Sequence, residues 1–172
     1  MSMPLVLGGP SGVGKSYFCK YLQENGWLHL EADQEEGNGI DKLGLRGKWD
    51  QFFEERKPEA LAAELMRRQA EGKYSSVVLS LPSPATPDSF LIEKSIQQLK
   101  IRFLWGREEF CILDFLMREK RTGRNLDAAH WHNNNDSVMQ KLSKPSYIAY
   151  LLNVYNADGQ RKPLEDVLAM LA

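Results

Sequence analysis

The amino-acid sequence predicts an α/β fold built on a mainly parallel β-sheet. Short apolar runs alternate along the chain with longer segments in which apolar residues recur at helical spacing, a pattern typical of parallel sheets covered by helices. The chain has 172 residues, of which 42% are hydrophobic and 26% are charged. This length suffices for one domain with a full core, and we expect residues 1–172 to form a single domain.

The first half of the chain is expected to supply two strands and three helices. The stop signal Asn25-Gly26 ends the first helix, and Pro58 and Gly72 are placed to begin and end the third. The polar, glycine-containing residues 34–39 predict a loop. The expected elements are, in order, a strand over 4–8, a helix over 15–25, a strand over 27–31, and helices over 41–55 and 59–71.

The second half is expected to continue the alternation. Residues 74–81 form an apolar run suited to a fully buried strand, and the prolines within 82–87 predict a loop after it. Residues 122–135 show little apolar periodicity and are expected to be a polar connection. The expected elements are strands over 74–81, 101–105 and 146–155, and helices over 88–99, 107–120, 136–142 and 163–171.

Composition and charge narrow the class of protein. The net charge of −1 gives no sign of a nucleic-acid partner. The sequence has no run of 18 apolar residues, and it enters its first strand directly, so neither a membrane span nor a signal peptide is expected. Cys19 and Cys111 are expected to be buried small hydrophobes. We expect a cytoplasmic protein, either a monomer or a homodimer.

The first helix is preceded by a glycine-rich motif of the form G-x-x-x-x-G-K-[ST]. Between a strand and a helix, such a loop turns its backbone N–H groups toward phosphate, which the helix dipole also favours. Lys15 would reach the β- and γ-phosphates of a nucleotide, and the Ser16 hydroxyl would ligate Mg²⁺. The residues expected to hold the nucleotide are Gly9, Pro10, Ser11, Gly12, Val13, Gly14, Lys15 and Ser16.

Two carboxylates follow the second strand. Alternation along a strand places Glu31 and Asp33 on the same side. Phosphoryl transfer to an alcohol needs charge neutralisation and a group that accepts the hydroxyl proton. We expect Glu31 near Mg²⁺, through water, and Asp33 near the acceptor hydroxyl. The alternative is that these carboxylates cap a helix or belong to a solvated loop.

Two clusters of basic residues complete the candidate site. Arg46 and Lys48 could clamp an acceptor beside Trp49, although a solvated face with one core tryptophan would give the same pattern. Arg118, Arg121 and Arg124 recur at helical spacing, and the polar segment after them suits a flap that closes over the triphosphate. The alternative for these arginines is a solvated basic helix end favoured by the helix dipole.

Taken together, these motifs resemble the small P-loop kinases of the nucleotide-kinase-like superfamily, and within it the gluconate kinase and shikimate kinase branch. Beside the loop at 9–16, Glu31-Ala32-Asp33 is similar to the E-G-D of gluconate kinases and the D-T-D of shikimate kinases. Residues 46–49 (RGKW) are similar to the R-x-P-W of gluconate kinases, and residues 121–124 (RTGR) to the R-K-G-H that opens their lid. The matches occur in the same order over most of the chain.

The resemblance implies a P-loop NTPase fold, with a five-stranded parallel sheet in the order 2-3-1-4-5 and a lid over about 118–137. It also implies ATP- and Mg²⁺-dependent phosphate transfer to a small hydroxylated metabolite such as a sugar or sugar acid. Asp33 would hold the acceptor hydroxyl and act as base, and Arg46 would bind the acceptor. Arg118 would bind the nucleotide and Arg121 would act from the lid. By the same resemblance, residues 156–159 would lie near the adenine.

The sequence also departs from these kinases. Residues 34–38 (QEEGN) replace the H-P-x-x-N of gluconate kinases, and residues 80–83 (SLPS) replace the motifs that end their third strand. The extra acids Glu35 and Glu36 disfavour a strongly anionic acceptor. Two alternatives stay open: a nucleoside or nucleotide kinase, because the loop also resembles that of guanylate kinases, and a nucleotide-binding regulator without kinase activity.

Overall fold

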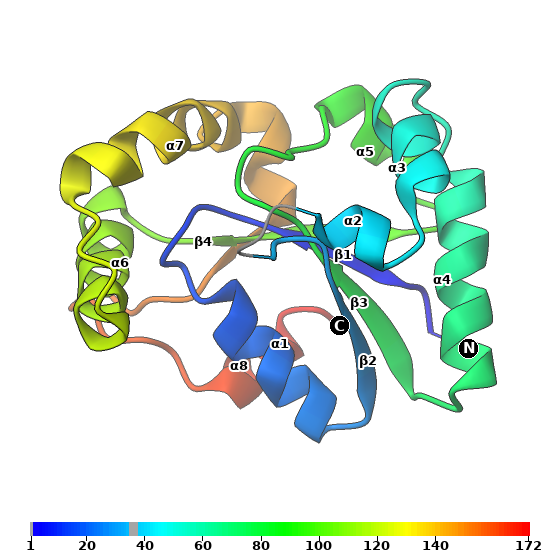
Figure 1. Ribbon diagram of the computed structural model, residues 1–172, viewed down its shortest axis with the longest axis horizontal. Coiled ribbons are helices and arrows are strands. Elements are labelled where there is room, and N and C mark those ends of the chain that lie inside the picture. The colour runs from blue at the N-terminus through cyan, green and yellow to red at the C-terminus, as the bar shows by residue number, and fades with distance from the viewer. Residues whose placement is uncertain (1, 35–37) are drawn as a thin grey trace.

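The central sheet has five strands, all parallel, in the order β2-β3-β1-β4-β5 (Figure 1). The computed structural model describes residues 2–34 and 38–172. Strand β1 lies at the centre, where Leu5 is in register with Val78 of β3 and Lys100 of β4. The predicted α/β class is confirmed, and so is the strand order that the family resemblance implied. The strands are β1 (Leu5–Gly8), β2 (Trp27–Glu31), β3 (Ser76–Ser80), β4 (Lys100–Trp105) and β5 (Leu151–Asn153).

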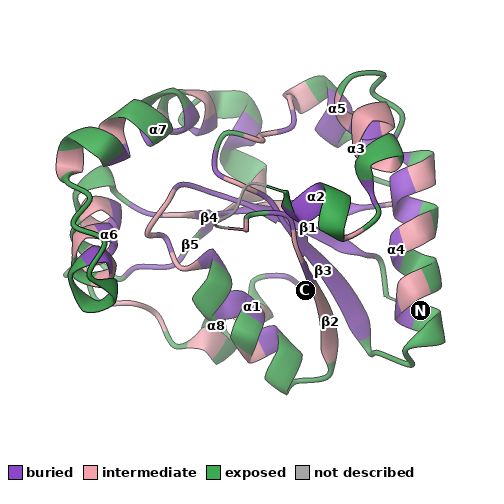
Figure 2. Cartoon of the chain, viewed as in Figure 1, coloured by how far each residue is buried: buried purple, intermediate pink, exposed green. Residues whose placement is uncertain are grey.

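Helices cover the sheet on both faces, and each face has its own hydrophobic core (Figure 2). Successive residues of β1 point to opposite faces, so Val6 packs with Leu61 of α4 whereas Leu7 packs with Phe18 of α1. The helices are α1 (Lys15–Glu24), α2 (Gly39–Lys42), α3 (Arg46–Phe53), α4 (Glu59–Glu71), α5 (Ser89–Ser95), α6 (Glu108–Thr122), α7 (Ala128–Leu142), the 3₁₀ helix η1 (Pro145–Tyr150) and α8 (Leu164–Ala169).

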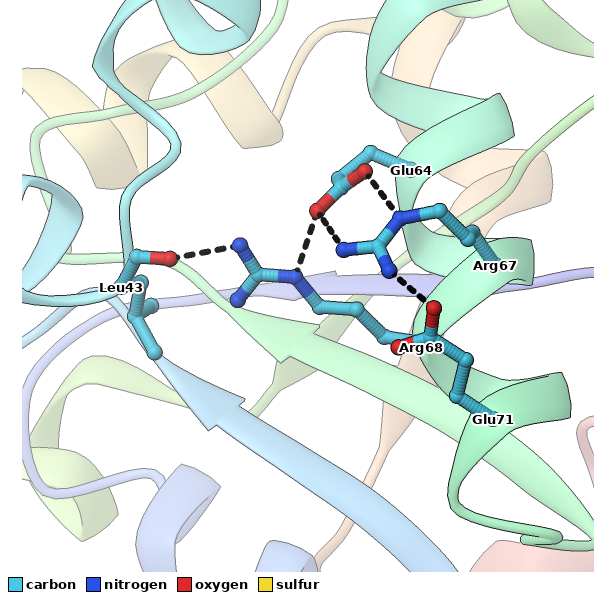
Figure 3. Close-up of polar contacts among 5 residues, drawn as sticks. All are labelled: Leu43, Glu64, Arg67, Arg68 and Glu71. Carbon is cyan, nitrogen blue, oxygen red and sulfur yellow. Dashed lines mark hydrogen bonds and ion pairs between the residues drawn. The ribbon is translucent and has the colours of Figure 1, made fainter.

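Helix α4 is tied to the segment before α3 by a polar network (Figure 3). Arg68 donates from Nη2 to the Leu43 carbonyl over 2.6 Å and from Nε to Glu64 over 2.8 Å. Arg67 pairs with Glu64 on one side and Glu71 on the other. The hydrogen bond from Arg67 lowers the pKa of Glu64 to about 2, so this carboxylate stays ionised and the network persists at neutral pH.

Two expected elements are wrong in extent. The helix expected over 41–55 is two helices, because Gly44 adopts the left-handed conformation (φ 68°) between α2 and α3, which ends a helix. The strand expected over 146–155 is reduced to β5, because Pro145 opens the 3₁₀ helix η1 and the Tyr147 hydroxyl donates to the Pro87 carbonyl. Apolar content alone did not distinguish these conformations.

The segment expected to be a polar connection, 122–135, is also partly helical. Helix α7 begins at Ala128, capped by Asp127, whose carboxylate accepts a hydrogen bond from the His130 amide over 2.9 Å. Its buried residues are Trp131, Asn135, Val138 and Leu142, which recur on one helical face. Because Asn135 is polar, it interrupts the apolar repeat of this face, and the sequence pattern did not predict the helix here.

Within the described residues, every helix is too short or too polar to cross a membrane.

Candidate active site

The glycine-rich loop connects β1 to α1 at the carboxyl end of the sheet. Gly9, Gly12 and Gly14 have positive φ angles of 135°, 82° and 99°. A Cβ atom on Gly9 would lie 2.5 Å from the Leu104 carbonyl oxygen, and one on Gly12 would lie 2.3 Å from the Cys111 carbonyl oxygen. The loop therefore requires glycine at these positions both for its backbone angles and for its close approach to neighbouring elements.

Lys15, the first residue of α1, turns its side chain back into the loop. Its Nζ donates to the Gly9 carbonyl over 2.7 Å and to the Pro10 carbonyl over 3.2 Å, and it lies 3.5 Å from the Ser83 hydroxyl. Burial lowers the pKa of Lys15 to about 8, and Asp33 opposes that shift. The structure thus holds a cation inside the loop in a position where it is only weakly solvated.

An arginine from the far end of the chain braces the middle of the loop. Arg161 donates to the carbonyl oxygens of Val13 over 2.7 Å and Gly12 over 2.8 Å. It also pairs with Asp114 of α6 at 2.8 Å. Burial raises the pKa of Tyr155, whose hydroxyl donates to Asp114 over 2.7 Å. Sequence reasoning missed this brace, and its only nearby signal was the turn at 156–159.

Helix α7 braces the start of the loop. The Trp131 indole N–H donates to the Ser11 carbonyl over 2.8 Å, and the Ser11 amide donates to Asn135 Oδ1 over 2.8 Å. Asn135 Nδ2 in turn donates to the Trp131 carbonyl over 2.9 Å. Trp131 and Asn135 are 0% and 1% exposed, so this is a buried polar contact with both partners satisfied. These residues were also missed, because they belong to the segment expected to be a polar connection.

A cavity of about 630 Å³ opens beside the loop, and we call it the larger cavity. Four of the charged residues that the sequence analysis singled out line it: Lys15, Asp33, Arg118 and Arg121. Lys15 and Ser16 line it from the loop, and Asp33 lines it from the end of β2. Its described lining residues are Ser11, Gly12, Gly14, Lys15, Ser16, Tyr17, Asp33, Asp114, Met117, Arg118, Lys120, Arg121 and Arg161.

A second cavity of about 220 Å³, the smaller cavity, adjoins the first. Ser11 and Asp33 line both cavities. Asp33 therefore lies where the two cavities meet, at the carboxyl edge of a parallel sheet, which is where ligands bind in folds of this kind. The described lining residues of the smaller cavity are Ser11, Asp33, Ser83, Pro84, Phe115, His130, Asn134 and Asn135.

Other predicted site residues lie elsewhere. Arg46, on the first turn of α3, is exposed and pairs with Asp41 at 2.9 Å and with Asp50 at 3.8 Å. In the described part of the chain, neither Arg46 nor Glu31 lines either cavity. The predicted acids Glu35 and Glu36 fall outside the described residues.

The three arginines predicted to share a helical face do not all do so. Arg118 and Arg121 lie on α6 and line the larger cavity. Gly123, with φ 74°, ends α6, so Arg124 follows the helix and pairs with the buried Glu119 at 3.1 Å. Arg118 lies over the Phe115 ring, 5.4 Å from its centroid. The predicted face is therefore reduced to two of the three residues.

Comparison with solved structures finds this fold in a kinase of known structure. A crystal structure of a gluconokinase from Sinorhizobium meliloti 1021 matches 98% of this chain and 89% of its own, with 18% identity and a TM-score of 0.51. A shikimate kinase from Bacteroides thetaiotaomicron matches 98% of this chain and 94% of its own, with 19% identity and a TM-score of 0.44. No family model and no curated protein sequence matches the chain. The chain has the fold of a small P-loop kinase, with the sheet order that the family resemblance implied.

Proposed function

We propose that this protein transfers the γ-phosphate of ATP to a hydroxyl group of a small metabolite. The observation that carries the proposal is the position of Asp33 at the junction of the two cavities. A carboxylate there can accept the proton of a hydroxyl in the smaller cavity as the hydroxyl attacks a phosphate in the larger one. Since the reaction requires mainly positioning and charge neutralisation, the remaining groups serve those two purposes.

The larger cavity suits a nucleoside triphosphate. Its described lining contains the cations Lys15, Arg118, Lys120, Arg121 and Arg161 but only the carboxylates Asp33 and Asp114, an excess of positive charge that favours polyphosphate. Mg²⁺, when bound with ATP, would neutralise charge on the phosphates. The Ser16 hydroxyl, from the lining of the larger cavity, would ligate it. Glu31 is not in the described lining of either cavity, so its contact with Mg²⁺ would have to run through water.

In this proposal the arginines of α6 act on the transferred phosphate. Arg118 would hold the nucleotide, and Arg121 would meet the charge that develops during transfer. Both lie at the start of the segment 118–137, which we propose as a lid whose moving part is the connection between α6 and α7. ATP and small metabolites are available together in the cytoplasm, which is where we propose that the protein works.

The proposal is tested by incubating the protein with Mg-ATP and a panel of sugars, sugar alcohols, sugar acids, nucleosides and aminoglycosides while ADP is measured. We expect ADP release to depend on one class of alcohol, and Asp33→Asn to lower kcat by about 100-fold or more. Asp166→Asn, on the exposed surface of α8, is the matched control and should leave kcat unchanged. ATP binding without acceptor-dependent ADP release would contradict the proposal, and selective turnover of nucleosides would support a nucleoside kinase.

The titration of Lys15 gives a separate prediction for ATP binding. Its pKa is lowered by burial to about 8, so the amine of the free protein loses its proton as pH rises through that value, whereas bound phosphate favours the ammonium form. ATP affinity should therefore fall by about tenfold per pH unit above about pH 8. Calorimetry between pH 7.5 and 9.5 should show proton uptake on binding. Lys120→Met keeps Lys15 and should show the same pH dependence; a flat profile in the unmodified protein would contradict the prediction.

A further inference from the structure

We infer that the acceptor is an uncharged polyhydroxyl compound of monosaccharide size, bound in the smaller cavity by α7 residues His130 and Asn134. That the bound compound is phosphorylated rests on the proposed function; that it binds does not. It also assigns a binding role to α7, which the sequence analysis treated only as part of a lid.

The first step of the argument is the separation of charge between the two cavities. The cations of the site line the larger cavity. Among the described residues that line the smaller cavity there is no lysine or arginine, and Asp33 is the one carboxylate. A carboxylate or phosphate on the acceptor would therefore lie near Asp33 with no cation in the described lining of its own cavity, and like charges at short range repel. An uncharged acceptor avoids that cost.

The second step concerns the cations near this cavity. The Lys15 Nζ lies 3.5 Å from the Ser83 hydroxyl, but Lys15 lines the larger cavity, where the γ-phosphate would engage it. Arg46, which the sequence analysis assigned to the acceptor, is held by Asp41 on α2 and by Asp50 on its own helix. Arg118 lies over the Phe115 ring but lines the larger cavity, where the nucleotide would engage it. None of these three cations is therefore committed to an acid group in the smaller cavity.

The third step is the chemistry of the lining. Asn134 donates through Nδ2 to the His130 carbonyl over 2.8 Å, which leaves its Oδ1 to accept from a ligand hydroxyl. The His130 ring stacks on the buried Phe115 ring, with centroids 6.3 Å apart and planes at 9°. The Ser83 hydroxyl adds a group that can donate or accept. An aromatic surface with a few convergent hydrogen-bonding groups is the usual construction of a small-molecule site.

The fourth step is size. Pockets for drug-sized ligands occupy roughly 300–1,000 Å³, and the larger cavity, at about 630 Å³, lies in that range. The smaller cavity is about 220 Å³, below it. A monosaccharide or sugar alcohol suits this volume better than a nucleoside does. The size of the cavity and the charge of its lining therefore both favour a small, uncharged acceptor.

The test compares matched pairs of acceptors that share a carbon skeleton, such as a six-carbon sugar alcohol and the corresponding sugar acid. The readouts are kcat and KM for each acceptor, and ligand-observed NMR of acceptor binding in the presence of a non-hydrolysable ATP analogue. Asn134→Ala is compared with Asn133→Ala, a neighbour on the same exposed stretch of α7 that does not line the cavity in the described structure. Asn134→Lys introduces a cation at the same position.

We expect the neutral member of each accepted pair to be preferred by about tenfold or more, which corresponds to one charge or hydrogen-bond mismatch. Asn134→Ala should raise its KM about tenfold with kcat retained, Asn133→Ala should change neither, and Asn134→Lys should shift preference toward the acid. Preference for the acid in the unmodified protein, or equal behaviour of Asn134→Ala and Asn133→Ala, would overturn the inference. If NMR shows Asn134-dependent binding of a neutral polyol without ADP release, the proposed function fails while the inference stands. If no neutral polyol binds, the inference fails.

Discussion

Replacing Lys15 with methionine is expected to lower the rate of phosphoryl transfer by about 10³-fold. The amine is the buried cation of the loop, with its Nζ 2.7 Å from the Gly9 carbonyl, and in the proposed reaction it meets the charge on the β- and γ-phosphates. Losing such a preorganised group removes stabilisation that water cannot replace in a partly enclosed site. The measurement is kcat under saturating Mg-ATP, with ATP affinity determined separately by calorimetry.

The same substitution should not weaken the fold. Burial lowers the pKa of Lys15 to about 8, which means that at neutral pH the native state holds an ammonium group at a cost. Methionine has a similar shape and carries no charge, so the free energy of unfolding at pH 7 should stay equal or rise by up to about 2 kcal/mol. Urea denaturation measures this, with Lys20→Met on the exposed side of α1 as the matched control. Full activity would contradict the proposed role of Lys15 in phosphoryl transfer, and a marked loss of stability would show that Lys15 has a structural role.

The sequence predicted the parts of the fold that depend on local patterns. Strand β2 and helix α4 have the bounds that were expected, 27–31 and 59–71, because each is closed by clear signals such as Asn25-Gly26 and Gly72. The strand order came from the family resemblance, not from periodicity. The boundary between α2 and α3 depends on the conformation of one residue, Gly44. The apolar pattern continues across this position, so the sequence predicted one helix there.

The residues of the candidate site also fall into those that a local pattern predicts and those that it does not. Lys15 and Ser16 belong to the glycine-rich motif and Asp33 follows strand β2, and the structure brings all three to one cavity. The braces of the loop are different, because they join residues far apart in the chain. Ser11 and Asn135 are separated by 124 positions, and Gly12 and Arg161 by 149. A single sequence does not indicate which distant polar residue will meet a given backbone carbonyl, so these contacts emerge only from the fold.

Arg46 shows how little a four-residue match to another family says about the surroundings of a side chain. The match over residues 46–49 suggested an acceptor-binding arginine, yet Asp41 and Asp50 provide nearby partners for its guanidinium. Its role in acceptor binding stays a prediction, which an Arg46→Ala variant would test in the same acceptor assay as Asn134→Ala. The four-residue pattern did not reveal these carboxylates, because neither belongs to it.

Trp131→Ala is expected to lower the free energy of unfolding by about 3–5 kcal/mol, the usual cost of truncating a buried tryptophan. Trp131 is 0% exposed and packs in the core around α1 and α6. Trp131→Phe keeps most of that packing but removes the indole N–H that donates to the Ser11 carbonyl, so it should cost only about 1 kcal/mol. Urea denaturation without nucleotide separates the two variants.

The phenylalanine variant also tests whether α7 shapes the nucleotide loop. Without the indole donor, Ser11 keeps only its amide contact with Asn135 on that helix, and the start of the loop becomes less well ordered. We expect ATP affinity to fall by about tenfold, the equivalent of one lost hydrogen bond, although the fold is retained. Trp49→Phe, on α3 and remote from the loop, should leave ATP affinity unchanged. Equal ATP affinity in Trp131→Phe and the unmodified protein would mean that α7 supports the core alone, because the loop would then hold its phosphate-binding shape without the contact from Trp131.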